Sequence, residues 1–183
     1  DGQLEGDLAL FESFLSGSTL GFIDSDRMEA IIDHYFAEGD FKKAKRAAEM
    51  ADINFSYNPV FKLRISQALS GLKSFNEALS LLATLEQTGL PQFEVWVTYG
   101  TIFSQMEDYT SAVHYLSMAL PLADKEDQIE IYLDISFAYQ KMKDMDGSIE
   151  VLTKGLAGNP TSESLLYELG FTYDRVGRYQ DSI

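Results

Sequence analysis

Residues 96–103 read Trp-Val-Thr-Tyr-Gly-Thr-Ile-Phe, with aromatic side chains three and then four residues apart around a glycine. Spacings of three and four residues place side chains on one face of an α-helix, so the stretch predicts a helix with an aromatic face. Gly100 lies on this helix, where the missing side chain would let a second helix approach closely. If the pattern recurs at a fixed period, the chain is a repeat protein and its fold follows.

The pattern does recur, and its period can be read from the bulky residue that opens each predicted turn between two helices. These residues are Phe41, Phe75, Tyr109, Met145 and Tyr179, at intervals of 34, 34, 36 and 34 residues. The fourth repeat therefore carries two extra residues, which we place in the polar loop 123–128. Five repeats in phase predict an array of helical hairpins.

Small residues keep the same register, which strengthens the prediction. Three positions after each turn residue the chain has Ala44, Ala78, Ala112, Ser148 and Ser182. Nine positions before it are Ile32, Ser66, Gly100, Ser136 and Gly170. Small residues at such positions let the two helices of a hairpin pack closely, and Ile32 is the bulky exception. We therefore expect Gly100 to lie opposite Ala112 and Ala119, where a large side chain would not fit.

This arrangement resembles the tetratricopeptide repeat (TPR) family, whose repeat opens with the motif W-x2-L-G-x2-Y. The resemblance covers about residues 25–183 and is strongest in two repeats, through Trp96, Tyr99, Gly100 and Phe103 and through Leu169, Gly170 and Tyr173. The second repeat departs from the motif, because Lys62 stands in place of the Trp and Leu69 in place of the Tyr. The resemblance implies an all-α solenoid of antiparallel helix hairpins with a right-handed superhelix.

The chain divides into an N-terminal segment, 1–24, and an array, 25–183, of four complete repeats and a truncated fifth. The segment contains a predicted helix over 4–15, which is either a cap or a decayed repeat, since Leu10 precedes Ala44 by 34 residues. The predicted helices of the array are 26–38, 41–54, 59–71, 75–88, 92–105, 109–121, 127–141, 145–157 and 162–175. A last helix begins near Tyr179 and stops at Ile183, so we expect a fragment of a longer protein.

Composition narrows the class of function. Among 183 residues, 29 are Asp or Glu and 14 are Lys or Arg, giving a formal net charge of −15. This acidity argues against nucleic-acid binding, which needs clustered Lys and Arg. No apolar run is long enough to insert into a membrane. The chain has no cysteine and no visible leader. We expect a cytoplasmic protein, with a periplasmic or secreted location as the alternative.

No constellation of catalytic or metal-binding residues is found in the sequence. Asp144, Asp146 and Gly147 imitate the middle of an EF-hand calcium loop, but Met142 and Thr153 occupy its first and last ligand positions. We interpret the segment as an ordinary turn. The two histidines are far apart in the sequence and lack metal-ligand spacing. We therefore predict no catalytic residue, no metal, no cofactor and no enzyme activity.

The resemblance also implies a binding surface, since in TPR arrays the first helix of each repeat lines a concave groove. Carried onto this chain, the groove residues of the middle and last repeats are Leu63, Gln67, Val97, Thr101, Leu133, Phe137, Tyr167 and Phe171. They form a largely apolar stripe flanked by acidic residues. The alternative is that part of this stripe packs against the next repeat as core. An exposed stripe would suit an apolar segment or amphipathic helix with basic flanks.

The predicted function is protein–protein recognition by a scaffold or adaptor that binds a peptide or a helical segment. An alternative is a recruiting or self-assembly segment of a larger multidomain enzyme or sensor. The truncated C-terminal repeat also predicts a weak homodimer through that end.

Overall fold

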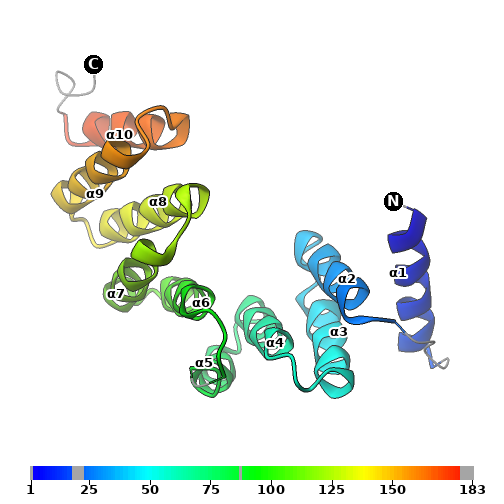
Figure 1. Ribbon diagram of the computed structural model, residues 1–183. Helices are drawn as coiled ribbons and strands as arrows, with labels where there is room; N and C mark the ends of the chain where they lie inside the picture. The colour runs from blue at the N-terminus through cyan, green and yellow to red at the C-terminus, as the bar shows by residue number, and fades with distance from the viewer. Residues whose placement is uncertain (1, 18–22, 87, 178–183) are drawn as a thin grey trace. The chain divides into compact units, whose positions relative to one another are not determined.

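The structure is a computed structural model that describes residues 2–17, 23–86 and 88–177, and the regular structure within them is entirely helical (Figure 1). The chain divides into two compact units, Asp1–Leu90 and Pro91–Ile183, which are described separately below as unit 1 and unit 2. In both units successive helices pack against one another as hairpins, which confirms the predicted all-α repeat array.

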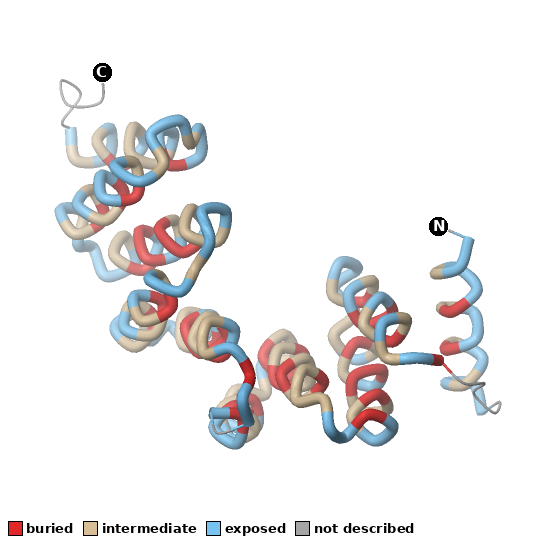
Figure 2. The backbone as a smooth tube through the Cα atoms, in the orientation of Figure 1, coloured by how far each residue is buried: buried red, intermediate tan, exposed pale blue. Residues whose placement is uncertain are grey.

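Within its described residues, unit 1 has five helices: α1 (Gly2–Leu15), α2 (Ser25–Ala37), α3 (Phe41–Asn54), α4 (Val60–Gly71) and α5 (Phe75–Ala83). Each helix packs against the next one in the chain. The core is built around α3, where Ala44, Ala47, Ala48 and Ala51 are fully buried (Figure 2). Because alanine has a short side chain, this face lets α2 and α4 pack closely on α3. Larger residues such as Phe11 and Ile31 fill the space that remains.

The described residues of unit 2 form five α-helices and one short 3₁₀ helix: α6 (Gln92–Gln105), α7 (Tyr109–Ala119), η1 (Leu120–Leu122), α8 (Lys125–Lys141), α9 (Met145–Gly158) and α10 (Glu163–Arg175). The helix α10 packs against both α9 and α8. A Cβ atom added at Gly100 would lie 2.6 Å from Cγ of Leu116 and 3.5 Å from the carbonyl oxygen of Ala112. The predicted close approach at Gly100 is therefore present, with Leu116 as its nearest neighbour.

The turn inside each hairpin has the same construction throughout the described chain. Its central residue has a left-handed backbone, with φ of 71° at Gly39, 61° at Lys73, 63° at Glu107 and 62° at Lys143. The backbone N–H of the following residue donates to the carbonyl five positions earlier, 2.9 Å away in every case. This is the Schellman motif, which satisfies carbonyls at the end of a helix.

The residue after the left-handed position has a second role in three of these turns. The side chain of Asp40 accepts a hydrogen bond from the backbone N–H of Lys43, so Asp40 caps the N-terminus of α3. Asp108 and Asp144 cap α7 and α9 in the same way. One residue thus ends the first helix and begins the second, and the hairpin turn contains no spare residue.

Some predicted helix boundaries are wrong by a few residues. The helix α5 ends at Ala83 rather than at 88, where the Thr84 hydroxyl donates to the Leu81 carbonyl, 2.6 Å away, and the chain turns. The helix α8 begins at Lys125, because Asp124 caps its first turn. The extra residues of the fourth repeat therefore lengthen α8 instead of forming a longer loop. Residues 179–183 of the predicted last helix lie outside the described residues.

The N-terminal helix α1 is anchored to the array by one aromatic residue and two charged ones. Phe11 is fully buried in the core of unit 1. Asp7 is buried and forms an ion pair with Arg27 of α2. Glu12 accepts hydrogen bonds from the Tyr35 hydroxyl at 2.8 Å and the Lys43 amine at 2.6 Å. In contrast to the fully buried Ala44, Leu10 is 47% exposed, so it does not occupy a small-residue position of the repeat.

Candidate interaction surfaces

The predicted groove residues of unit 2 separate into an exposed set and a partly buried set. Phe137 on α8 is 47% exposed, and Tyr167 and Phe171 on α10 are 74% and 46% exposed. We call these three residues the aromatic face. Val97 and Leu133 instead pack against the clusters of the core. Since α8 and α10 are in contact, the aromatic face belongs to two neighbouring helices.

The remaining predicted groove residues offer less to a partner. Leu63 in unit 1 is only 2% exposed, so the alternative interpretation, that the stripe is partly core, holds at this position. Gln67 accepts a hydrogen bond from Arg64, which also binds Asp33 at 2.7 Å. The Thr101 hydroxyl donates to the carbonyl of Val97 in its own helix, 3.0 Å away.

Two cations that were not predicted from the sequence lie over the aromatic face. The Lys141 amine is 5.0 Å from the ring centroid of Phe137, and the Arg175 guanidinium is 5.7 Å from that of Phe171. Each cation follows its ring by four residues on the same helix, and the two pairs are one 34-residue period apart. An aromatic residue followed four positions later by a cation was the signal that could have revealed them.

Hydrogen bonds behind the aromatic face hold α8 and α10 together. The Gln140 side-chain amide donates to Glu168 at 2.8 Å and lies 3.2 Å from the Thr172 hydroxyl. Arg175 donates to the side-chain carbonyl oxygen of Gln140 at 3.1 Å. Because Thr172 is fully buried, the network fixes the relative position of the two helices and therefore of Phe137 and Phe171.

Two acidic residues, Glu130 and Asp134, lie on α8 between its N-terminus and the aromatic face. Asp134 is one helical turn after Glu130. The atoms packed around the Asp134 carboxyl raise its pKa, and the negative charge of Glu130 raises it further. A cationic group of a partner near this pair would favour the charged form of Asp134.

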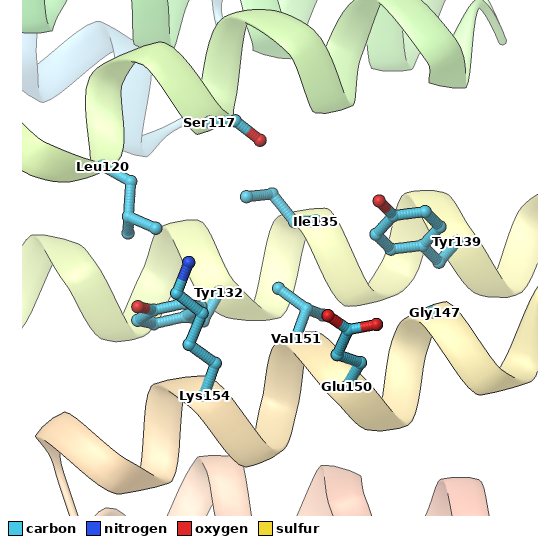
Figure 3. Close-up of a pocket in the computed structure, with 9 residues that line it drawn as sticks. All are labelled: Ser117, Leu120, Tyr132, Ile135, Tyr139, Gly147, Glu150, Val151 and Lys154. Carbon is cyan, nitrogen blue, oxygen red and sulfur yellow. The ribbon is translucent and has the colours of Figure 1, made fainter.

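A second surface feature of unit 2 is a groove between α7 and α9 with α8 as its floor (Figure 3). It encloses about 220 Å³. Leu120, Ile135 and Val151 contribute its apolar lining, and the polar lining comes from Ser117, Tyr132, Tyr139, Glu150 and Lys154. Lys154 and Glu150 both extend from α9 across the groove, one helical turn apart, with Lys154 beside Tyr132. No pattern in the sequence indicated this groove, because its residues come from three helices.

The turn that imitates a calcium loop is a helix start. Asp144 uses its carboxylate to accept the backbone N–H of Gly147 at 2.9 Å, as an N-cap does. His34 and His114 each lie edge-on to the adjacent tyrosine of their own helix. In residues 2–17, 23–86 and 88–177 no group of three or more His, Asp or Glu side chains is arranged to hold a metal ion. Within the same residues, no helix combines the length and apolarity needed to cross a bilayer.

Comparison with known proteins places these features in context. The family model described as "Tetratricopeptide repeat" matches residues 129–161. A curated relative, the photosystem I assembly protein Ycf3 of Prochlorococcus marinus (strain MIT 9215), is 33% identical over 75 residues. That match covers 40% of this chain and 43% of Ycf3, so the similarity extends over less than half of either protein.

Solved structures are similar over most of the chain. A TPR protein of Thermus thermophilus aligns with a TM-score of 0.71 at 19% identity, over 93% of this chain and 91% of that one. The protein MamA of Desulfovibrio magneticus RS-1 aligns with a TM-score of 0.64 at 17% identity, over 85% and 86% of the two chains. At these identities the similarity shows a shared fold.

Proposed function

We propose that this chain, a tetratricopeptide-repeat protein, works as a non-enzymatic scaffold or adaptor that holds a protein partner on the aromatic face of unit 2. The observation that carries the proposal is the exposure of Phe137, Tyr167 and Phe171 on two neighbouring helices. Large aromatic side chains dominate the binding energy of many protein interfaces. The assembly role in the name of the curated relative, photosystem I assembly protein, is of the same general kind.

The charges around the aromatic face define the partner that we propose. Glu130 and Asp134 favour basic groups at one end of α8, whereas Lys141 and Arg175 already lie over the rings. A helical or extended segment with apolar residues and a basic flank would pack on the rings and place its cations near the two carboxylates. Burial of Asp134 by such a segment would make the ion pair less sensitive to salt than one in open solvent.

A model peptide tests this proposal. A fluorescently labelled amphipathic peptide of leucine and lysine should bind the protein in an anisotropy titration. Replacing Phe137 and Phe171 together by alanine should weaken binding about tenfold or more, because each ring acts as an aromatic anchor. Tyr57→Ala is the matched control, since Tyr57 is an 80% exposed aromatic residue in unit 1. It should leave the affinity unchanged.

A second peptide, in which glutamate replaces each lysine, checks the charge argument. It should bind more weakly than the lysine peptide. The double variant Glu130→Lys, Asp134→Lys should reduce the difference in affinity between the two peptides. Equal binding of both peptides to the parent protein, unaffected by the loss of the two phenylalanines, would contradict the proposed site.

A second candidate function is self-association through α10. Leu166 is 50% exposed, and a Cβ atom added at Gly170 would meet no atom within 4 Å. The equivalent Gly100 is closely packed, so α10 has an open face among the described residues. We propose a weak homodimer there, as part of a larger assembly. Sedimentation velocity at increasing concentration should show association that Leu166→Glu reduces, and a strictly monomeric parent protein would contradict it.

A further inference from the structure

The groove between α7 and α9 has a counterpart in unit 1 at the same place in the repeat. The unit 1 groove lies between α3 and α5 over α4 and encloses about 410 Å³. When residues are numbered from the turn residue that begins the second helix of each repeat, three equivalent positions line the groove in both units. In unit 1 they are Glu49, Leu69 and Glu77, and in unit 2 they are Ser117, Tyr139 and Gly147. The two grooves therefore occupy equivalent positions of the repeat, and their polar side chains can be compared directly.

In unit 1 three of the five charged side chains that line the groove bind each other. Glu49 forms ion pairs with Lys45 and, at 3.8 Å, with Arg46. Lys45 and Arg46 thus share one carboxylate on their own helix. A ligand would have to compete with these pairs, whereas Lys42 and Glu77 form no ion pair within the described residues.

The polar groups of the unit 2 groove behave differently. Five polar side chains face a floor of Leu120, Ile135 and Val151. Across the part of the chain that the structure describes, none of the five forms a side-chain hydrogen bond or ion pair. They are Ser117, Tyr132, Tyr139, Glu150 and Lys154. An apolar floor ringed by a few unpaired polar groups is the usual composition of a ligand site.

The size of the groove restricts its ligand. Its volume of about 220 Å³ is smaller than the roughly 300–1,000 Å³ of sites for whole small molecules. The groove is large enough for one apolar side chain of a peptide. The hydroxyl groups of Tyr132 and Tyr139 would then be available to the peptide backbone, which carries one donor and one acceptor per residue.

We propose that the groove between α7 and α9 is a second interaction site, which binds an extended peptide segment with an acidic and a basic residue on either side of one apolar residue. The acidic residue lies beside Lys154 and the basic residue beside Glu150, by charge complementarity. In an extended segment, residues i, i+2 and i+4 point to one face, so the two charged residues flank the apolar one on the side that faces the groove. The site is independent of the aromatic face, because it is lined by different residues and chiefly by second helices of the hairpins.

The test uses two capped pentapeptides, Asp-Ala-Leu-Ala-Lys and its reverse, Lys-Ala-Leu-Ala-Asp, added to the ¹⁵N-labelled protein. One of them should shift amide signals of α7, η1 and α9, with a dissociation constant on the order of 1 mM. The double variant Glu150→Lys, Lys154→Glu exchanges the two charges of the groove. In this variant the other peptide should bind more tightly, by about threefold or more in dissociation constant. A role of these residues in stability alone would not produce such an inversion.

Two further variants locate the binding. Ser117→Trp should abolish it by filling the groove, since Ser117 is exposed and the change leaves the core intact. Phe171→Ala should leave the pentapeptides bound, although it weakens the leucine–lysine peptide of the proposed function. Failure of either peptide to shift signals, or a loss of binding in Phe171→Ala alone, would overturn the proposal. So would concentration-dependent dimerisation that Ser117→Trp removes, because the occupant would then be a second copy of the chain.

Discussion

Both units have closely packed small residues between their helices, such as Gly71 against Phe41 in unit 1, but the ion pairs between helices that the structure describes lie in unit 1. In unit 1 ion pairs connect α1 to α2, α1 to α3 and α2 to α4, through Arg27–Asp7, Lys43–Glu12 and Arg64–Asp33. In unit 2 the joints are made by small residues: Gly100 packs against Leu116, Gly155 against Tyr132, and the buried Ser136 and Ser148 hydroxyls lie 2.8 Å apart. The same repeat geometry is therefore compatible with two kinds of contact.

The difference bears on what each unit tolerates. Ion pairs between partly exposed side chains contribute little stability individually and weaken with salt or acid. Close-packed joints are insensitive to salt, but they leave no room for an added side chain. We therefore expect both units to be destabilised by added bulk at these positions, and unit 1 to respond more strongly than unit 2 to changes of charge.

The largest effect should come from Gly100→Leu in unit 2. The new side chain would overlap with Leu116, whose Cγ atom is 2.6 Å from the position of an added Cβ. Overpacking of this kind should lower the free energy of unfolding by about 3 kcal/mol. Urea denaturation followed by circular dichroism measures the change.

Two control variants sharpen this comparison. Gly170→Ala occupies the equivalent position of the last repeat, where an added Cβ meets nothing within 4 Å, so it should stabilise its helix slightly. Ile32→Val in unit 1 should cost about 1 kcal/mol, because it removes one methyl group from a fully buried side chain. If Gly100→Leu unfolds at the same urea concentration as the parent protein, the assigned packing of α6 against α7 is wrong.

A smaller and local effect should follow acidification of unit 1. Hydrogen bonds from Arg27 lower the pKa of Asp7, and those from Lys43 and Tyr35 lower the pKa of Glu12. Since both pKa values are lower in the folded state, their contribution is complete above about pH 5 and is lost as the pH falls through the folded values. Amide signals of α1 should therefore change below about pH 4, before those of α6.

Neutral variants check that the two carboxylates cause this response. Asp7→Asn with Glu12→Gln should weaken the contact of α1 with α2 at neutral pH and leave little further change on acidification. Signals of α1 and α6 that change together over the whole pH range would mean that the ion pairs do not hold α1 in place.

The smallest effects should come from substitutions at the left-handed turn positions. The first hairpin turn of unit 1 has Gly39 at this position, and the three later turns have Lys73, Glu107 and Lys143. A left-handed backbone strains residues that have a side chain, although glycine gives up more entropy on folding. Replacing any of the three by glycine should raise the free energy of unfolding by about 0.5–1 kcal/mol. Gly39→Lys should lower it by a similar amount, and urea midpoints that move the opposite way would contradict the turn assignment.

Most of the fold could be predicted from the sequence because the period and the turn residues are local signals. The positions of Phe41, Phe75, Tyr109 and Met145 alone locate four second helices, each of which begins at that residue in the structure. The boundary at Ala83 was missed because no glycine or proline marks it; the backbone N–H groups of Thr84 and Leu85 bond there to carbonyls three residues earlier, which tightens and ends the helix.

The candidate surfaces were less accessible to prediction. The helical register places Leu63 and Phe137 at groove positions, but only packing decides that Leu63 is 2% exposed and Phe137 is 47% exposed. The cations over the rings follow a local spacing and could have been found. The groove between α7 and α9 could not, because its polar groups are brought together by three helices and their lack of partners is visible only in three dimensions.

The hairpin turn, in which one aspartate both ends a helix and caps the next, restricts how such a chain can change in length. Three residues separate the paired helices in each of the four hairpins from α2–α3 to α8–α9, whereas the connections between repeats vary. The two additional residues of the fourth repeat are accommodated at the start of α8, outside any hairpin turn. Insertions, including tags and fused domains, should therefore be tolerated at the junctions between repeats and should disrupt folding within a hairpin turn.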